Sequence, residues 1–379
     1  MSIAWRASVL RRLHLLLGGL LSIPLAVIGL SGSVLIFEPQ LQAGHDLMPA
    51  SIGPMQTYAA MVEAARAAAP KDFVPNTIFA PVAPGDLAML RFSDPRHPGP
   101  GGVEIYLDPS RLTVRGVVRP GEGWLREIFF LHANAGLRDR NGRAIGGWFG
   151  VVMCVLAITG IVMQFPTRRR WRQAMTIQRR ARGYWLLRQL HGAIGFWFWL
   201  LLLIISFSGV WLSFPQSFNS LTAAWGIRDL RPAVGAPKVA LSDGATALDV
   251  DGAVALAQAT RPDLTLRSIA LPQRADQPYR VALGEDHALP VIAFIDPWQR
   301  KVVELRDPHD YSVAERVVAS MHAIHDGSGF GWFWRALVFI SGLLPASFAV
   351  SGVAMWLVKC KLDRAAYRSR LMPFGTPGE

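Results

Sequence analysis

The stretch "LHLLLGGLLSIPLAVIGLSG", residues 13–32, has a close counterpart later in the chain in "LHGAIGFWFWLLLLIISFSG", residues 190–209. Each stretch begins with Leu-His, has a glycine four residues after the histidine, and ends with Ser-Gly, whose glycine lies eighteen residues after the histidine. Neither contains Lys, Arg, Asp or Glu, and each has the length of about 20 apolar residues that a membrane-crossing helix requires. We therefore expect two membrane-spanning helices that carry a histidine at the same place.

Composition supports a membrane protein with additional domains. The 379 residues are 51% hydrophobic and only 17% charged, whereas soluble domains carry about 25% charged residues. Two further apolar stretches bring the predicted spans to four, and the long segments between paired spans predict two domains outside the membrane. The predicted segments are an N-terminus (1–12), spans at 13–37, 144–166, 191–214 and 336–358, domains at 38–143 and 215–335, a basic loop (167–190) and a tail (359–379).

Positive charge indicates the orientation of these spans. It gathers before the first span, between the second and third, and after the fourth, as the positive-inside rule expects of cytoplasmic segments. Both termini and the middle loop are therefore predicted to be cytoplasmic, and the net charge of +12 does not imply nucleic-acid binding. The first span is too long for a cleaved signal and lacks an A-x-A site, so we expect it to remain as an anchor. The charges are Arg6, Arg11, Arg12, Arg168, Arg169, Arg170, Arg172, Arg179, Arg180, Arg182, Arg188, Lys359, Lys361, Arg364, Arg368 and Arg370.

The repetition extends into the two predicted domains. The segment "VEIYLDPSRLTVRGVV" (103–118) resembles "VIAFIDPWQRKVVELR" (291–306), and each is preceded by an Ala-rich helical stretch and alternating strands. Asp-Pro favours a turn, because Asp bonds its own backbone and Pro fixes φ. The sequence therefore predicts two parallel copies of a span–domain–span unit, related by an axis along the membrane normal, and each domain is a small α+β unit.

A helix followed by strands and an apolar strand ending in Asp-Pro resembles a PepSY domain. Two such units, interleaved with four spans that begin with Leu-His or end with Ser/Thr-Gly, resemble the PepSY-associated transmembrane proteins over nearly the whole chain. That family includes iron-regulated inner-membrane proteins and ferric-siderophore reductases. The resemblance implies a bacterial inner-membrane protein with two periplasmic PepSY-like domains and, for the reductase branch, b-type haem held by histidine.

His14 and His191 are the first candidate ligands, because they begin the first and third spans at equivalent positions. The expected axis brings them together, and haem iron takes two axial imidazoles on opposite faces. Gly18 and Gly195 lie on the same helical face as their histidines and leave room for a flat macrocycle. The alternatives are that the glycines serve helix–helix contact and that the histidines only cap or snorkel at a helix end.

A second pair is predicted from spacing at the other side of the membrane. His132 precedes Gly160 by 28 residues and His325 precedes Gly352 by 27, whereas His322 precedes it by 30. This favours His325 as the partner of His132, and "HDGSGFG" resembles the family's His-acidic-Gly-x-x-Phe-Gly pattern. His322 remains the alternative ligand or a supporting group. The prediction is two b-type haems per chain, one at each face of the membrane.

Several side chains have less specific expectations. Asp326 either orients an imidazole by accepting its second N–H or caps a turn. Four histidines without partners at useful spacing are predicted to be solvated or structural: His45, His97, His287 and His309. Five arginines of the first domain either attract an anionic ferric chelate or are dispersed surface charge: Arg91, Arg111, Arg115, Arg119 and Arg126.

The leading functional hypothesis is a di-haem oxidoreductase of the bacterial inner membrane that reduces a periplasmic ferric siderophore and so releases Fe(II). The chain shows no nucleotide-binding motif, so its electron donor is expected to be a cytoplasmic reductase or a membrane quinol. The alternative is a PepSY membrane regulator or partner subunit without a cofactor. A non-haem metal would suit four imidazoles at one site, and a transporter usually needs ionisable groups within the spans; neither is expected here.

Overall fold

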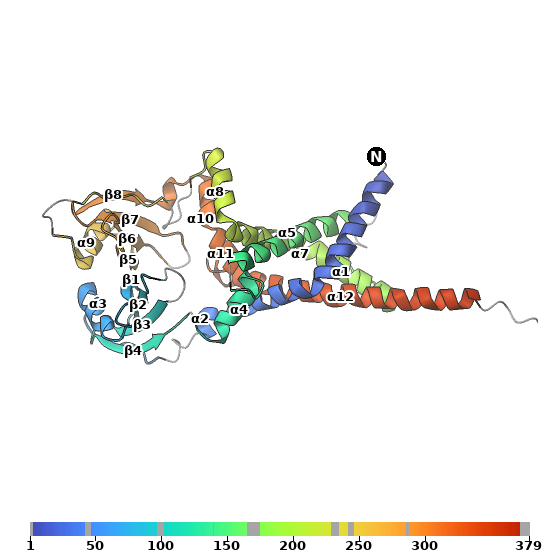
Figure 1. Ribbon diagram of the computed structural model, residues 1–379, viewed down its shortest axis with the longest axis horizontal. Helices are drawn as coiled ribbons and strands as arrows, with labels where there is room; N and C mark the ends of the chain where they lie inside the picture. Colours follow the sequence, from blue (N-terminus) through green and yellow to red (C-terminus); the bar gives the residue numbers. More distant parts are fainter. Residues whose placement is uncertain are drawn as a thin grey trace, which may run out of the picture.

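The computed structural model has two parts, a bundle of long helices and a sheet region beside one end of it (Figure 1). It describes residues 3–41, 47–96, 102–120, 122–138, 140–164, 175–228, 235–241, 246–285 and 288–371. His45, His97, His287 and the arginines Arg168, Arg169, Arg170 and Arg172 lie outside the described residues, and so do parts of the predicted basic loop and tail.

Four helices form the bundle, and each overlaps one predicted span: α1 (Ile3–Leu35), α5 (Arg140–Gln164), α7 (Gly183–Ser213) and α12 (Gly331–Leu371). The first and third predicted spans, 13–37 and 191–214, extend past the ends of α1 and α7, and residues 165–166 of the second lie outside the described residues. Each is long and apolar enough to cross a membrane, over Ser8–Leu35, Asn141–Gln164, Gly183–Ser213 and Gly331–Arg364. Outward-facing apolar side chains stay exposed, among them Leu20, Ile23 and Val350 at 70–72%. Large exposed apolar surface is not stable in water, so these helices are suited to contact with lipid.

The helices pair across the two halves of the chain, the N-terminal half ending with α5 and the C-terminal half beginning with α7. α1 packs against α12, and α5 packs against α7. At the first contact the Ser33 hydroxyl donates to the Phe339 carbonyl at 2.9 Å, and Gly29 faces the backbone of Gly342. Small residues let helix backbones approach closely in a membrane. The first span of each half therefore packs against the second span of the other half.

The sheet region is a single eight-stranded antiparallel sheet in the order β4-β3-β2-β1-β5-β6-β7-β8. The sequence predicts two α+β units, and the structure joins them edge to edge, with Ile78 of β1 paired to Ile269 of β5. Both isoleucines are fully buried, so pairing removes two strand edges that would otherwise expose unpaired backbone groups. The strands are β1 (Val74–Phe79), β2 (Ala88–Ser93), β3 (Gly102–Asp108), β4 (Thr113–Val118), β5 (Leu266–Ala270), β6 (Tyr279–Leu283), β7 (Val291–Asp296) and β8 (Lys301–Arg306).

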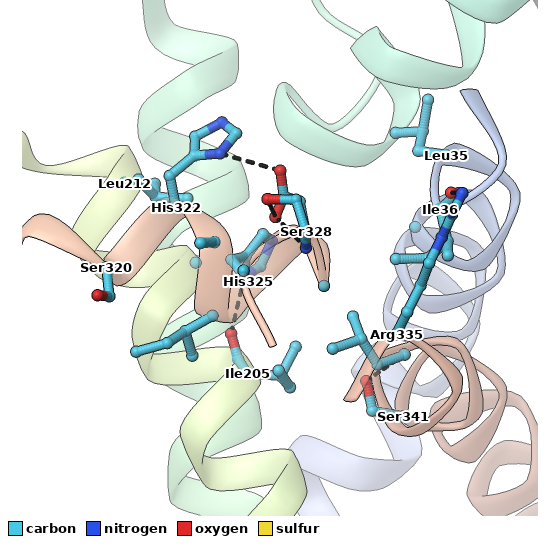
Figure 2. A pocket seen from close by; sticks show the side chains of 18 of the residues that line it. Leu35, Ile36, Ile205, Leu212, Ser320, His322, His325, Ser328, Arg335 and Ser341 are labelled. Carbon is cyan, nitrogen blue, oxygen red and sulfur yellow. Dashed lines mark hydrogen bonds and ion pairs between the residues drawn. The ribbon is translucent and has the colours of Figure 1, made fainter. Parts of the chain in front are cut away.

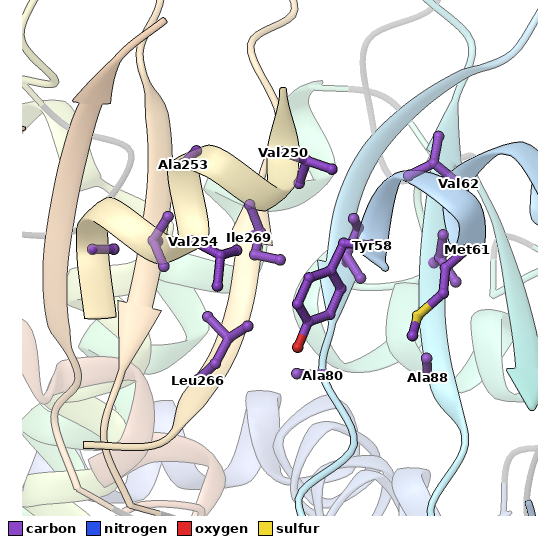
Figure 3. Packing of buried hydrophobic residues seen from close by; sticks show 14 of the residues in the cluster. Tyr58, Met61, Val62, Ala80, Ala88, Val250, Ala253, Val254, Leu266 and Ile269 are labelled. Atoms are coloured by element: carbon purple, nitrogen blue, oxygen red, sulfur yellow. The ribbon is translucent and has the colours of Figure 1, made fainter. Parts of the chain in front are cut away.

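Helices α3 (Tyr58–Arg66) and α9 (Val250–Thr260) cover one face of this sheet and share its hydrophobic core (Figure 3). Met61 of α3 and Ala253 of α9 are fully buried in one cluster that includes strands of both halves. The Asp251 carboxylate of α9 accepts hydrogen bonds from the Tyr58 and Ala59 amides at 2.7 and 3.0 Å. A carboxylate at a helix N-terminus is stabilising, so the two halves are also joined at the first turn of α3.

The predicted Asp-Pro turns end β3 and β7 in matching ways. The Asp108 carboxylate has no exposed surface and accepts from the Ser51 amide at 2.8 Å, the Ser110 amide at 3.0 Å and the Arg115 guanidinium at 2.8 Å. Burial alone raises the pKa of Asp108, but these donors outweigh it and hold the pKa well below its usual range. Asp296 accepts in the same way from the amide of Trp298 at 2.8 Å.

We predict that Asp108→Asn lowers the free energy of unfolding by about 1–3 kcal/mol at pH 7, because buried donors lose a charged acceptor. The folded-state pKa lies below the unfolded value of about 3.9. The wild-type advantage is therefore fully present above that value and lost as pH falls through the folded pKa. Denaturant unfolding at pH 7 and at about pH 2, below the unfolded pKa, measures it. Asp263→Asn, at an exposed ion pair, is the control, and an equal loss in both variants would contradict the prediction.

Candidate functional site

His14 of α1 and His191 of α7 lie next to each other within the bundle. Their ring centroids are 6.4 Å apart and their planes are inclined by 80°. The Nδ1 atom of His14 lies 2.8 Å from Thr159 Oγ1, and that of His191 lies 2.8 Å from Ser351 Oγ. Both predicted ligands of the first pair are therefore adjacent, although they come from different halves of the chain. We call them the sheet-distal pair.

His132 and His325 form a second pair beside the sheet region, at the end of α4 (Trp124–Ala133) and in α11 (Met321–Asp326). Their ring centroids are 5.9 Å apart and their planes are inclined by 41°. The His132 Nδ1 atom lies 2.8 Å from the Ile28 carbonyl, and the His325 Nδ1 atom lies 3.1 Å from the Ile205 carbonyl. We call these two histidines the sheet-proximal pair.

Hydrogen bonding indicates where the ring protons lie in both pairs. The hydroxyls of Thr159 and Ser351 donate to backbone carbonyls of their own helices, so each accepts from an imidazole Nδ1–H. A carbonyl oxygen can only accept, so the same assignment holds for the sheet-proximal pair. Burial lowers the pKa of His132 and lowers that of His325 to about 4, which keeps both rings neutral. Each of the four imidazoles therefore keeps an Nε2 lone pair for a ligand bond.

The Ser/Thr-Gly dipeptides near the ends of the spans form the surfaces against which the rings pack. A Cβ added to Gly32 would lie 2.7 Å from His132 Cε1, and one added to Gly209 would lie 2.9 Å from His325 Cε1. The corresponding distance from Gly160 to His14 is 3.3 Å. In the sequence analysis these dipeptides served only as evidence of a repetition. The sequence signal that could have assigned them to the sites is their equal spacing of eighteen residues from His14 and His191.

Gly18 and Gly195, predicted to make room for a macrocycle, have no close neighbour. A Cβ added to either would lie 3.9 Å from the nearest side-chain atom, of Leu156 and of Phe348 respectively. An alanine at either place would meet only ordinary van der Waals contact. The glycines in tightest contact with histidine rings are those of the Ser-Gly dipeptides, which sequence reasoning did not assign to the sites.

The two pairs lie at opposite ends of the bundle. α1 carries His14 of the first pair and, eighteen residues later, Gly32, which contacts His132 of the second. At 1.5 Å per residue this separation corresponds to about 27 Å along the helix. α7 repeats the arrangement with His191 and Gly209. The four imidazoles therefore do not meet at one site, as expected from the sequence.

His322, the alternative ligand, does not join the sheet-proximal pair. Its side chain is 76% exposed, and its Nδ1 atom lies 3.1 Å from the Asp326 carboxylate, which raises the pKa of His322. Figure 2 draws this contact, which does not involve His325. Asp326 thus orients an imidazole as predicted, but that of His322. His309 lies in the short turn Pro308–Asp310 and lines the same cavity as the sheet-proximal pair.

A cavity of about 2010 Å³ opens beside the sheet-proximal pair, between the bundle and the sheet region (Figure 2). This volume exceeds the range of about 300–1,000 Å³ that is common for small-molecule sites. His132, His322 and His325 line it, together with four arginines: Arg143, Arg267, Arg316 and Arg335. The cavity is large enough for a cofactor at the histidine pair and for a second molecule beside it.

The five arginines predicted to attract a chelate are different ones, and four of them have partners elsewhere. Arg91 pairs with Glu104 at 2.5 Å and Arg115 with Asp108 at 2.8 Å. Arg119 lies 3.9 Å from Glu122, and the Arg126 guanidinium lies 4.3 Å from the Phe130 ring. The second interpretation, dispersed charge, therefore describes them better than a binding surface.

The spacing within each pair fits a metal ion held between two Nε2 atoms. A metal–imidazole bond of about 2.0 Å on each side places the Nε2 atoms about 4 Å apart and the ring centroids about 6 Å apart. The centroid distances of 6.4 and 5.9 Å agree with this geometry. Within the described ranges, no group of three or more His, Cys, Asp or Glu side chains is arranged to hold a metal. A metal at either pair would need its other ligands from a cofactor.

Comparison with protein families identifies the family of the chain. A family model described as "PepSY-associated TM region" matches residues 11–359. None of the curated proteins compared with the chain matches it. The matched segment includes both histidine pairs, the sheet region and all four dipeptides that contact the rings.

Proposed function

Because the chain belongs to the PepSY-associated transmembrane family, we propose that it is a membrane oxidoreductase that binds one b-type haem at each histidine pair. The observation that carries this proposal is the arrangement of four imidazoles in two facing pairs at opposite ends of one bundle. Each imidazole presents an Nε2 lone pair, because its Nδ1–H is bound to the protein. Haem is the cofactor class that needs two axial imidazoles and supplies the remaining ligands itself.

When bound, haem supplies a one-electron carrier at each end of the bundle. The protein's own groups hold the rings for this role. Thr159 and Ser351 fix the sheet-distal imidazoles, and the Ile28 and Ile205 carbonyls fix the sheet-proximal ones. Such bonds set the tautomer and ring orientation and raise the basicity of the ligand atom. The apolar spans exclude water between the two sites.

The distribution of positive charge supports an orientation of the protein in the membrane. Arg11 and Arg12 lie in the N-terminal part of α1, and Arg188 lies near the start of α7, all at the sheet-distal end. By the positive-inside rule this end faces the cytoplasm, and the sheet region then faces the periplasm. We propose that a cytoplasmic reductase or a quinol delivers electrons to the sheet-distal side. An oxidised molecule in the cavity would accept them at the sheet-proximal side.

The proposed acceptor is a ferric chelate such as a siderophore complex. One electron converts Fe(III) to Fe(II), which hard oxygen ligands bind far less tightly, so reduction releases the metal. The cavity offers space beside the histidine pair, and its arginines suit a chelate with negative charge.

We also propose that the two halves are copies of one span–PepSY–span unit. Each contributes a helix, four strands in succession, a histidine-bearing helix and a second span.

The optical spectrum of the purified protein tests this function. A Soret band, with split α and β bands after dithionite reduction, is expected of bis-histidine haem. A colourless preparation from haem-replete cells would overturn the proposal and support a cofactor-free regulator or partner subunit. The spectrum thus separates an electron carrier from a binding module.

We predict that Gly32→Ala removes most of the haem at the sheet-proximal pair, because its Cβ would lie 2.7 Å from His132 Cε1 and push the ring aside. Gly352→Ala is the matched control, since its Cβ would lie 4.0 Å from His191 Cε1, an ordinary contact. The haem content per chain of the two variants measures the difference. Equal content in both would show that the Ser/Thr-Gly dipeptides do not shape the sites.

A further inference from the structure

Two arginines occupy matching places around the cavity. Arg143 of α5 precedes Gly160 by seventeen residues, and Arg335 of α12 precedes Gly352 by seventeen. Both side chains are half-buried and line the cavity beside the sheet-proximal pair.

Neither arginine pairs with a carboxylate among the residues that the structure describes. Arg143 donates to the Leu212 carbonyl at 2.9 Å. Arg335 donates to the Ile36 carbonyl at 2.5 Å and to Gln40 Oε1 at 2.6 Å (Figure 2). These bonds cap the ends of α7 and α1, but a guanidinium carries five N–H donors. A half-buried charge without a counter-ion is costly, so both places suit an anion.

We propose that Arg143 and Arg335 bind the two propionate carboxylates of a haem held by the sheet-proximal pair, one arginine to each carboxylate. The inference rests on the proposed function and adds a second set of contacts to it. Haem carries its two carboxylates side by side on one edge. A two-fold rotation about the axis that lies in the haem plane and passes between the carboxylates exchanges the two faces of the haem. The same rotation exchanges the two carboxylates.

The protein's pairing matches this symmetry. His132 and Arg143 come from the N-terminal half, and His325 and Arg335 come from the C-terminal half. The histidines would meet opposite faces, and the arginines would meet opposite carboxylates. Arginine binds carboxylates through two parallel charge-assisted hydrogen bonds, so each guanidinium can keep its carbonyl contact with one N–H and use others for the cofactor.

The test is a binding cycle on the full-length protein with haem and with haem dimethyl ester, whose carboxylates are blocked. A His14→Ala background leaves only the sheet-proximal pair to load. In this parent we expect the ester to bind at least tenfold more weakly than haem, since charge-assisted bonds are lost. In the Arg143→Gln/Arg335→Gln double variant haem should bind as weakly as the ester. Removing the arginines and blocking the carboxylates abolish the same interaction, so the two losses of affinity do not add.

Two further variants keep the result interpretable. Arg143→Lys/Arg335→Lys retains both charges and should retain part of the preference for haem. Arg316→Gln removes an exposed charge from the same cavity and should leave the preference unchanged. Equal binding of haem and ester by the parent, or an equal preference in parent and double variant, would overturn the inference alone. A parent that binds no haem would overturn the inference and the proposed function together.

Discussion

Replacing His14 with alanine is expected to abolish electron transfer across the membrane. The haem at the sheet-proximal pair should still exchange electrons with molecules on its own side. The two pairs are about 27 Å apart along α1, and the bundle between them is apolar. Loss of one axial ligand is expected to remove the haem at the sheet-distal pair. The haem at the sheet-proximal pair would then be left without an electron donor at the other end of the bundle.

Proteoliposomes that enclose dithionite, with a ferric chelate and an Fe(II) indicator outside, measure the transfer. Vesicles with the wild-type protein should form Fe(II) at a rate well above that of protein-free vesicles. Vesicles with His14→Ala should form it at the protein-free rate. Dithionite added outside is the control, because it should still reduce the haem that remains in the variant. A His14→Ala protein that transfers electrons at the wild-type rate would contradict the two-site account.

The second large effect concerns haem content. His14→Ala and His325→Ala should each leave about one haem per chain where the wild type has two, because each belongs to a different pair. His322→Ala should leave both haems in place, since its side chain is 76% exposed and contacts Asp326 instead. The pyridine haemochrome assay, set against protein concentration, measures the content.

The His322 and His325 variants are matched, being one helical turn apart on α11 with the same side-chain change. If His322→Ala lost a haem and His325→Ala did not, ligation would belong to His322. If neither lost one, the sheet-proximal assignment would be wrong even where the protein contains haem.

Much of the fold and of the site could be predicted because the information was local or repeated. Apolar runs without charge predicted the spans, and each of the four overlaps a membrane-length helix of the bundle. His14 was paired with His191 because each lies eighteen residues before the glycine of a Ser-Gly dipeptide. His325 was favoured over His322 because its spacing to the next Ser/Thr-Gly glycine differs by only one residue from that of His132. The structure brings these histidines together as expected, and each pair joins a residue of the N-terminal half to one of the C-terminal half.

Other features depend on contacts between distant segments, which local patterns do not encode. The joining of β1 to β5 requires two buried edges to meet in register, and register is fixed by burial in the folded state. The histidines pack against dipeptides of helices that follow or precede them by many residues, so neither stretch reveals its partner. Arg143 and Arg335 look like ordinary charges at the start of a span until the cavity is seen.

The electron paramagnetic resonance spectrum of the oxidised protein tests the central claim, a bis-histidine haem at each pair, most directly. Nearly perpendicular imidazole planes give a highly anisotropic low-spin ferric signal, and less inclined planes give a rhombic one. The planes are inclined by 80° at the sheet-distal pair and by 41° at the sheet-proximal pair. We predict one signal of each kind, of equal integrated intensity, with His14→Ala removing the anisotropic one. A protein without any low-spin ferric haem signal would contradict the account.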